Sequence, residues 1–241
     1  MNGTVGPVST PTSGLPGPPG DQPRTKAEQR RHELAHTSLR RAMHPTSPSG
    51  AIVVMGALLV AMWLLLSVDA LLDHRLLRFG IKPRELAGLY GLLLTPVLHS
   101  SAAQLAADSL PLAVLGWIML VAGGRTFVLV TAGVWLASGV VDWLAGPAHA
   151  VILGAGGVIF GWLGYILARA WFGRKVAWIA TAVAVLLVFS GLLSGLLPKL
   201  HSNTFWGGQL AGFVAGALIG ALLHGRRRAG RPASTPLPGN L

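Results

Sequence analysis

The sequence contains no cysteine, and only 11% of its residues are Asp, Glu, Lys or Arg. Without thiols the chain cannot form disulfides or thiolate metal sites, and it cannot use a cysteine nucleophile. The scarcity of charge, together with 52% hydrophobic residues and a mean hydropathy of +0.59, excludes an ordinary soluble domain. We therefore expect lipid to be the solvent for most of the chain.

Acidic residues are scarcer still, with 8 Asp and Glu against 19 Lys and Arg, which gives a formal net charge of +11. A basic balance is common in nucleic-acid-binding domains. Here, however, the arginines lie in terminal tails and short loops, without interleaved aromatic residues. We interpret this charge as a topology signal and expect no nucleic-acid partner. Neither a metal nor a cofactor is expected, since no H-E-x-x-H or comparable motif is present.

Several apolar runs, separated by charged residues, glycine or proline, are each long enough to cross a bilayer as a helix, which takes about 20 residues. No ten-residue pieces alternate between polar and apolar residues, so a β-barrel is not indicated. The sequence predicts an all-α integral membrane protein with six transmembrane helices and the lipid bilayer as its first partner. The predicted spans lie near residues 51–71, 102–122, 126–145, 155–172, 176–197 and 205–224.

The segments outside these spans differ in character. Residues 1–50 and 225–241 are rich in Gly, Pro, Ser and Arg, and we expect disordered basic tails because they cannot bury enough apolar surface. Residues 73–101 form a long first loop. Its apolar stretch Leu86–Leu98 contains Pro96 and is too short to span, so we expect a loop that is partly immersed in the membrane.

Lys and Arg are distributed unequally between the two sides of the predicted bundle. If the N-terminus is inside, most of the 19 basic residues fall on the inner side. The positive-inside rule then predicts a multi-pass protein of the cell membrane with both termini in the cytoplasm. The basic stretch from Arg24 to His44 is either a solvated tail, which we favour, or a short helix against anionic headgroups.

Two predicted spans carry glycines at helical spacing, which gives each span a face of small residues. In lipid, such faces let helix backbones approach, and close packing is a main source of helix association. We predict that the fourth and sixth spans pack tightly. The glycines are Gly157, Gly161 and Gly164 in the fourth span and Gly212, Gly216 and Gly220 in the sixth.

Three motifs resemble those of the rhomboid intramembrane serine proteases. Residues Gly154–Gly161, GAGGVIFG, resemble G-x-S-G-x-x-x-G with glycine at the serine position, Gly156. Residues Gln209–Gly216, QLAGFVAG, resemble H-x-x-G-x-x-x-G with the histidine replaced by glutamine. Gln104 and Asp108 stand where many rhomboids have H-x-x-x-N.

This resemblance extends over residues 76–224, and the arginine-rich composition is similar to that of the actinobacterial branch. It implies a six-helix rhomboid-like bundle and serine endopeptidase ancestry, in which a base activates a hydroxyl and donors hold the oxyanion. Gly156 has no hydroxyl and Gln209 no useful basicity, so no catalytic residue is intact. Gln104 retains an amide donor at an oxyanion position, whereas an ionised Asp108 would repel an oxyanion.

We therefore predict a proteolytically inactive rhomboid, a pseudoprotease, that binds transmembrane segments of other membrane proteins. Asp108 either has a function of its own or is a structural group that hydrogen-bonds Gln104 or Gln209 in the former active-site cavity. His99 is expected to anchor the first loop by hydrogen bonding.

Two other functions remain open. An active protease with a relocated site would use the serines and acidic groups near His99, or serines of the fifth span, but nothing fixes an attack geometry. Asp108 and Asp142 do not form the G-x-G-D pattern of aspartyl proteases. A small transporter or channel has only Asp108 and a polar cavity in its favour, without an inverted repeat. The serines concerned are Ser100, Ser101, Ser190 and Ser194.

Overall fold

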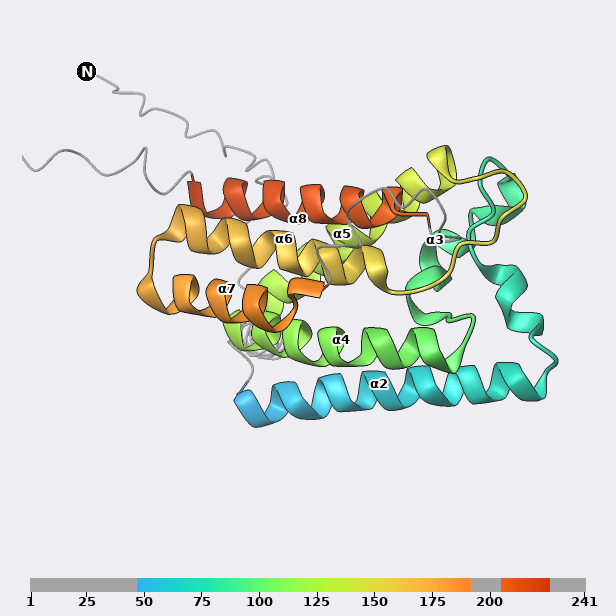
Figure 1. Ribbon diagram of the computed structural model, residues 1–241, viewed down its shortest axis with the longest axis horizontal. Helices are drawn as coiled ribbons and strands as arrows, with labels where there is room; N and C mark the ends of the chain where they lie inside the picture. Colours follow the sequence, from blue (N-terminus) through green and yellow to red (C-terminus); the bar gives the residue numbers. More distant parts are fainter. Residues whose placement is uncertain (1–46, 192–204, 226–241) are drawn as a thin grey trace, which may run out of the picture. The chain divides into compact units, whose positions relative to one another are not determined.

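The computed structural model describes residues 47–191 and 205–225, which fold into packed helices (Figure 1). Within these residues the β pairing is limited to one isolated bridge between Ile81 and Ile152. Four helices, α2, α4, α5 and α8, are long and apolar enough to cross a membrane, so the predicted all-α membrane fold is confirmed. The longer helices are α2 (Pro48–Leu71), α4 (Ala102–Ala122), α5 (Gly124–Ala145), α6 (Gly156–Gly173), α7 (Val176–Val188) and α8 (Gly207–Gly225).

The first helix begins earlier than its hydropathy suggests, because a capping serine and a proline start it. The Ser47 side chain accepts a hydrogen bond of 3.1 Å from the amide of Gly50, and Pro48 occupies the first turn. Proline is suited to that position, since its missing N–H would have no partner there. The structured part thus begins within the predicted tail 1–50, whose residues 1–46 lie outside the described residues, as do 226–241.

The fifth predicted span, 176–197, is the one whose helix differs most from the prediction. Helix α7 ends at Val188, and Phe189 at its C-terminus has left helical geometry. Ser190 and Gly191 follow, and both are weaker helix formers than the apolar residues before them. The 13 residues of α7 rise about 20 Å, less than the roughly 30 Å of a hydrocarbon core. Residues 192–197 lie outside the described residues.

The first loop contains several short helical turns in place of a spanning helix. Thr95 ties it to the segment that precedes α6: its hydroxyl accepts from the amide of Ile81 and donates to the carbonyl of Ile152, each at 3.1 Å. The amide of Gly154 donates to the Thr95 carbonyl at 3.0 Å. The turns are η1 (Arg75–Phe79), η2 (Leu86–Gly88), α3 (Gly91–Leu94) and η3 (Thr95–Val97).

Helices α6 and α8 approach until their backbones touch. A Cβ added at Gly212 would collide with the carbonyl oxygen of Gly157, and one added at Gly216 with that of Gly161. Gly164 lies in the same way against the Phe213 carbonyl. Only glycine allows this approach, so small residues determine the helix spacing.

The remaining packing glycines of the two helices contact side chains. Gly157 and Gly161 also face α5, where an added Cβ would meet Ser138 and Val134. A Cβ at Gly220 would lie 2.8 Å from the Cβ of Ala168. Helix α6 is therefore held between α5 and α8, and its Trp162 and Tyr165 are fully buried in the bundle.

Replacing Gly216 by alanine should weaken the bundle strongly, because a backbone carbonyl cannot move aside as a side chain can. We expect Gly216→Ala to lower the free energy of unfolding by about 2–3 kcal/mol, measured by denaturant titration in mixed micelles. Gly56→Ala on α2 is the matched control, since an added Cβ there meets nothing within 4 Å. Equal stability of the two variants would contradict the proposed role of the α6–α8 contact.

Candidate functional site

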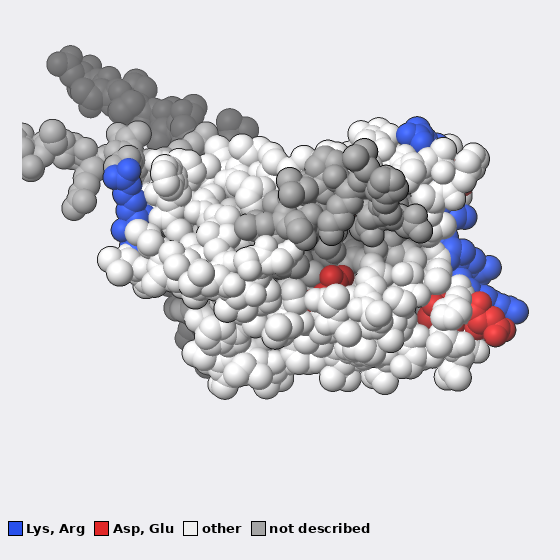
Figure 2. All heavy atoms as spheres, viewed as in Figure 1, with Lys and Arg blue, Asp and Glu red and all other residues white. Residues whose placement is uncertain are grey.

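A polar cavity of about 430 Å³ lies at the end of the bundle where α4, α6 and α8 begin. Figure 2 shows acidic atoms in a recess of the visible face of the molecule, apart from the other charged groups. The described lining contains two carboxylates and two carboxamides, and it contains no Lys, Arg or His. Its polar side chains are Ser100, Gln104, Asp108, Asp142 and Gln209.

The positions of the family nucleophile and base are brought together at this cavity. Gly156 is the first residue of α6, and Gln209 lies in the first turn of α8. A Cβ at Gly156 would lie 3.0 Å from Nε2 of Gln209 and 3.3 Å from its Cγ. Side chains at these two positions would therefore be in contact, as a nucleophile and a base must be.

Gln104 fastens the chain segments on either side of the cavity. Its Oε1 accepts from the amide and the hydroxyl of Ser100, at 3.0 and 2.8 Å. Its Nε2 donates to the carbonyl of Leu153 at 3.0 Å. Gly154 turns the chain into α6 with a φ of 115°, and an added Cβ would collide with the Gln104 amide. One N–H of the predicted oxyanion donor is thus already engaged in structure.

Asp108 pairs with the first loop. Its Oδ2 lies 3.2 Å from Nε2 of His99, so its partner is His99 rather than Gln104 or Gln209. His99 is 3% exposed and precedes α4, and its bond to Asp108 ties the end of the loop to that helix. The Nδ1 atom of His99 is buried and has no hydrogen-bond partner among the described residues.

Asp142 is the cavity residue that sequence reasoning missed. It lies near the end of α5 and is 8% exposed. An added Cβ at Gly208, in the first turn of α8, would collide with its carboxylate oxygens, so glycine is needed there. The backbone of Gly208 hydrogen-bonds the Asp142 carboxyl group, whereas its Oδ1 atom has no hydrogen-bond partner within the described part of the chain. An aspartate inside an apolar run was the available signal, since ionisable groups in membrane helices are usually functional.

The serines near the cavity are bonded in ways that do not activate them. The Ser100 hydroxyl donates to Gln104, Ser101 caps α4 through the Gln104 amide, and Ser138 donates to the Trp135 carbonyl at 3.1 Å. Ser190 bonds the Leu187 carbonyl at 3.5 Å, and Ser194 lies outside the described residues. None of the bonded hydroxyls has histidine or a carboxylate as its partner in these contacts. The described residues also include no cluster of three His, Asp or Glu that could hold a metal.

Comparison with known proteins identifies the family. The model of the Rhomboid domain matches residues 87–226. An uncharacterized protein of Mycobacterium tuberculosis is 37% identical over 171 residues, covering 68% of this chain and 71% of that protein. An uncharacterized protein of Mycobacterium leprae is 32% identical over 189 residues, which cover 76% of this chain and 74% of the Mycobacterium leprae protein. This multi-pass membrane protein therefore belongs to the rhomboid family.

Proposed function

We propose that this rhomboid-family protein is proteolytically inactive and binds transmembrane segments of other membrane proteins, with both of its termini in the cytoplasm. The observation that carries the proposal is the contact between positions 156 and 209. Their separation suits a catalytic dyad, yet Gly156 offers no nucleophile and Gln209 no base. The scaffold is thus retained without the groups that perform the chemistry.

The loss of both groups removes nearly all of the expected activity. In serine proteases, removal of the nucleophile or the base costs on the order of 10⁶ in turnover, and the remainder comes from binding and the oxyanion hole. Here the oxyanion positions are also altered. Gln104 already donates to Leu153, and Asp108 adds a carboxyl group bonded to His99.

The composition of the cavity supports a binding role. Its carboxylates and amide oxygens are hydrogen-bond acceptors, and the Asp142 carboxyl group, which is hydrogen-bonded by the Gly208 backbone, has a buried Oδ1 atom with no partner among the described residues. A buried acceptor without a partner is costly, and lipid tails supply no donor. A client helix that brings a hydroxyl, amide or ammonium group to the cavity would satisfy it, and apolar lining from Val151 and Phe205 would contact the rest.

Restoring the two missing groups should restore some proteolysis. We expect no cleavage of a model transmembrane substrate in proteoliposomes by the native chain or by either single variant, and measurable cleavage by Gly156→Ser/Gln209→His. The serine fits, since the three atoms nearest to an added Cβ at Gly156 all belong to the Gln209 side chain, which the double variant replaces. Product formation is followed by gel and mass spectrometry.

The native chain is its own control in this assay. If it cleaves the substrate, and Asp108→Ala abolishes the cleavage, then a relocated active site exists and the inactive assignment is wrong.

Clients should cross-link to the cavity and not to the lipid-facing surface. We expect a photoreactive amino acid in place of Val151, which lines the cavity and is 43% exposed, to capture discrete membrane proteins in cells. Val128, which is 62% exposed on α5, is the control position. Peptide mapping should place the adducts in transmembrane segments. Capture at Val151 that does not exceed capture at Val128 would contradict client binding.

A further inference from the structure

A second cavity, of about 270 Å³, lies at the opposite end of the bundle and is bordered by positive charge. It is formed where α6 ends, α7 begins and α8 ends. Figure 2 shows Lys and Arg at this end of the visible face without acidic atoms among them. None of the described acidic residues lines the cavity. Its polar lining consists of Arg169, Arg174, Lys175, Trp178 and His224.

The guanidinium of Arg169 is held in place by aromatic groups. It lies 3.9 Å from the centroid of the Trp178 ring, and its Nη1 donates to the hydroxyl of Tyr165 at 3.2 Å. That hydroxyl in turn lies 3.0 Å from Nε2 of His224. None of the described carboxylates pairs with this guanidinium, and the contacts fix its planar group, which suits bidentate binding of a phosphate.

The start of α7 adds further donors. The helix begins at Val176, and Lys175 at its N-cap makes no side-chain capping bond. The amide of Trp178 already donates to the Lys175 carbonyl at 2.9 Å, and the other amides of this first turn lie at the positive end of the helix dipole. Beside the side-chain cations they favour a bound anion, as at other phosphate sites.

An apolar groove meets the basic cavity at Arg174, which indicates that the ligand is amphipathic. The groove, of about 560 Å³, runs between α6 and α7, and Arg174 lines both it and the basic cavity. Its other walls are almost entirely hydrocarbon, from Leu167, Ala170, Ile179, Val183 and Leu186 among others. A phosphate held by Arg174 would therefore lie beside an apolar groove that could accommodate an acyl chain.

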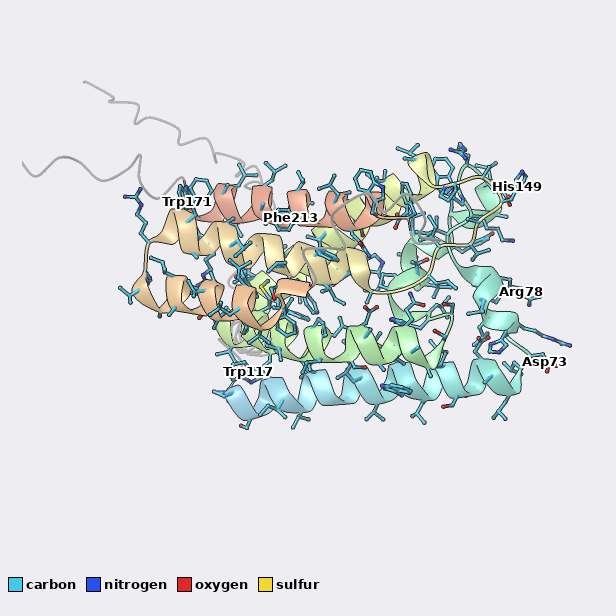
Figure 3. All side chains as sticks on the ribbon, in the orientation of Figure 1. Asp73, Arg78, Trp117, His149, Trp171 and Phe213 are labelled. Carbon is cyan, nitrogen blue, oxygen red and sulfur yellow. The ribbon has the colours of Figure 1, made fainter. Side chains whose placement is uncertain are left out.

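Tryptophan indicates that this cavity lies at the depth of lipid headgroups. Trp171 is 75% exposed near the end of α6, and Figure 3 shows it at the opposite end of the bundle from Arg78. Trp117 donates to the carbonyl of Pro48 at 3.0 Å, at the start of α2. Tryptophan is enriched at the membrane interface, where phosphates also lie.

We propose that Arg169, Arg174 and Lys175, with the start of α7, form a site for the phosphate of an anionic phospholipid, one acyl chain of which lies in the α6–α7 groove. Basic cavities between membrane helices are suited to such headgroups. This site is remote from the polar cavity at the start of α6, and the inference does not depend on the proposed function.

The test compares lipids by native mass spectrometry of the full chain released from detergent micelles. Phosphatidylglycerol and phosphatidylcholine with identical acyl chains are titrated separately. We expect phosphatidylglycerol to bind about tenfold more tightly, and Arg174→Gln/Lys175→Gln to remove most of that preference. Both side chains are exposed, so this variant should fold. Arg169→Lys keeps the charge and loses the fork, so an intermediate loss is expected.

The control removes the same charge at the other end of the bundle. Arg75→Gln/Arg78→Gln should leave the preference unchanged, because these residues lie in η1. Equal binding of the two lipids, or an equal loss of the phosphatidylglycerol preference in the control variant, would contradict the proposed site. The basic residues would then serve only to set the membrane topology. Displacement of phosphatidylglycerol by inorganic phosphate or glycerol phosphate at equal concentration would show a free-phosphate site and overturn the lipid assignment.

Discussion

The contact between the α6 and α8 backbones sets the positions of the other functional parts. Lipid tails are as apolar as leucine, so helices in a membrane gain little from burying hydrocarbon and more from close packing. Gly212 and Gly216 lie against the carbonyl oxygens of Gly157 and Gly161, respectively. This approach is possible because Gly212 and Gly216 carry no side chain. Residues 156 and 209 precede these glycines on the same two helices. Their separation is therefore fixed by backbone packing and needs no bond between the two side chains.

This separation of roles would let a rhomboid fold persist without a serine at position 156 and a histidine at position 209. Positions 156 and 209 border the cavity, while the backbone contacts begin at Gly157 and continue along the two helices. The polar cavity is held instead by Gln104, which bonds Ser100 and Leu153, and by the Asp108–His99 pair. A serine and a histidine at the cavity edge contribute to none of these bonds. The absence of this serine and this histidine therefore affects the chemistry available in the cavity more than the hydrogen bonds that hold the cavity together.

The sequence predicts those features that the bilayer or a local spacing dictates. Hydropathy places the long helices because hydrocarbon thickness fixes their length, and four-residue glycine spacing identifies the packed faces. Local hydropathy could not give the end of α7, where apolar residues continue past Val188 although the helix stops. The bond between Asp108 and His99 depends on how the first loop folds. The proximity of Asp142 to Gly208 joins helices that are distant in sequence, so no local pattern contains it.

Helix α6 connects the two ends of the molecule, and its length relates their functions. Its 18 residues rise about 27 Å, close to the thickness of a hydrocarbon core. The polar cavity at its first residue and the basic cavity at its last turn therefore lie at opposite ends of the bundle. A phosphate held beside Arg174 would set the depth of α6 in the bilayer. Because α6 is a continuous helix packed on α8, that same contact would set the depth at which Gly156 and the acceptor-rich cavity meet a client segment.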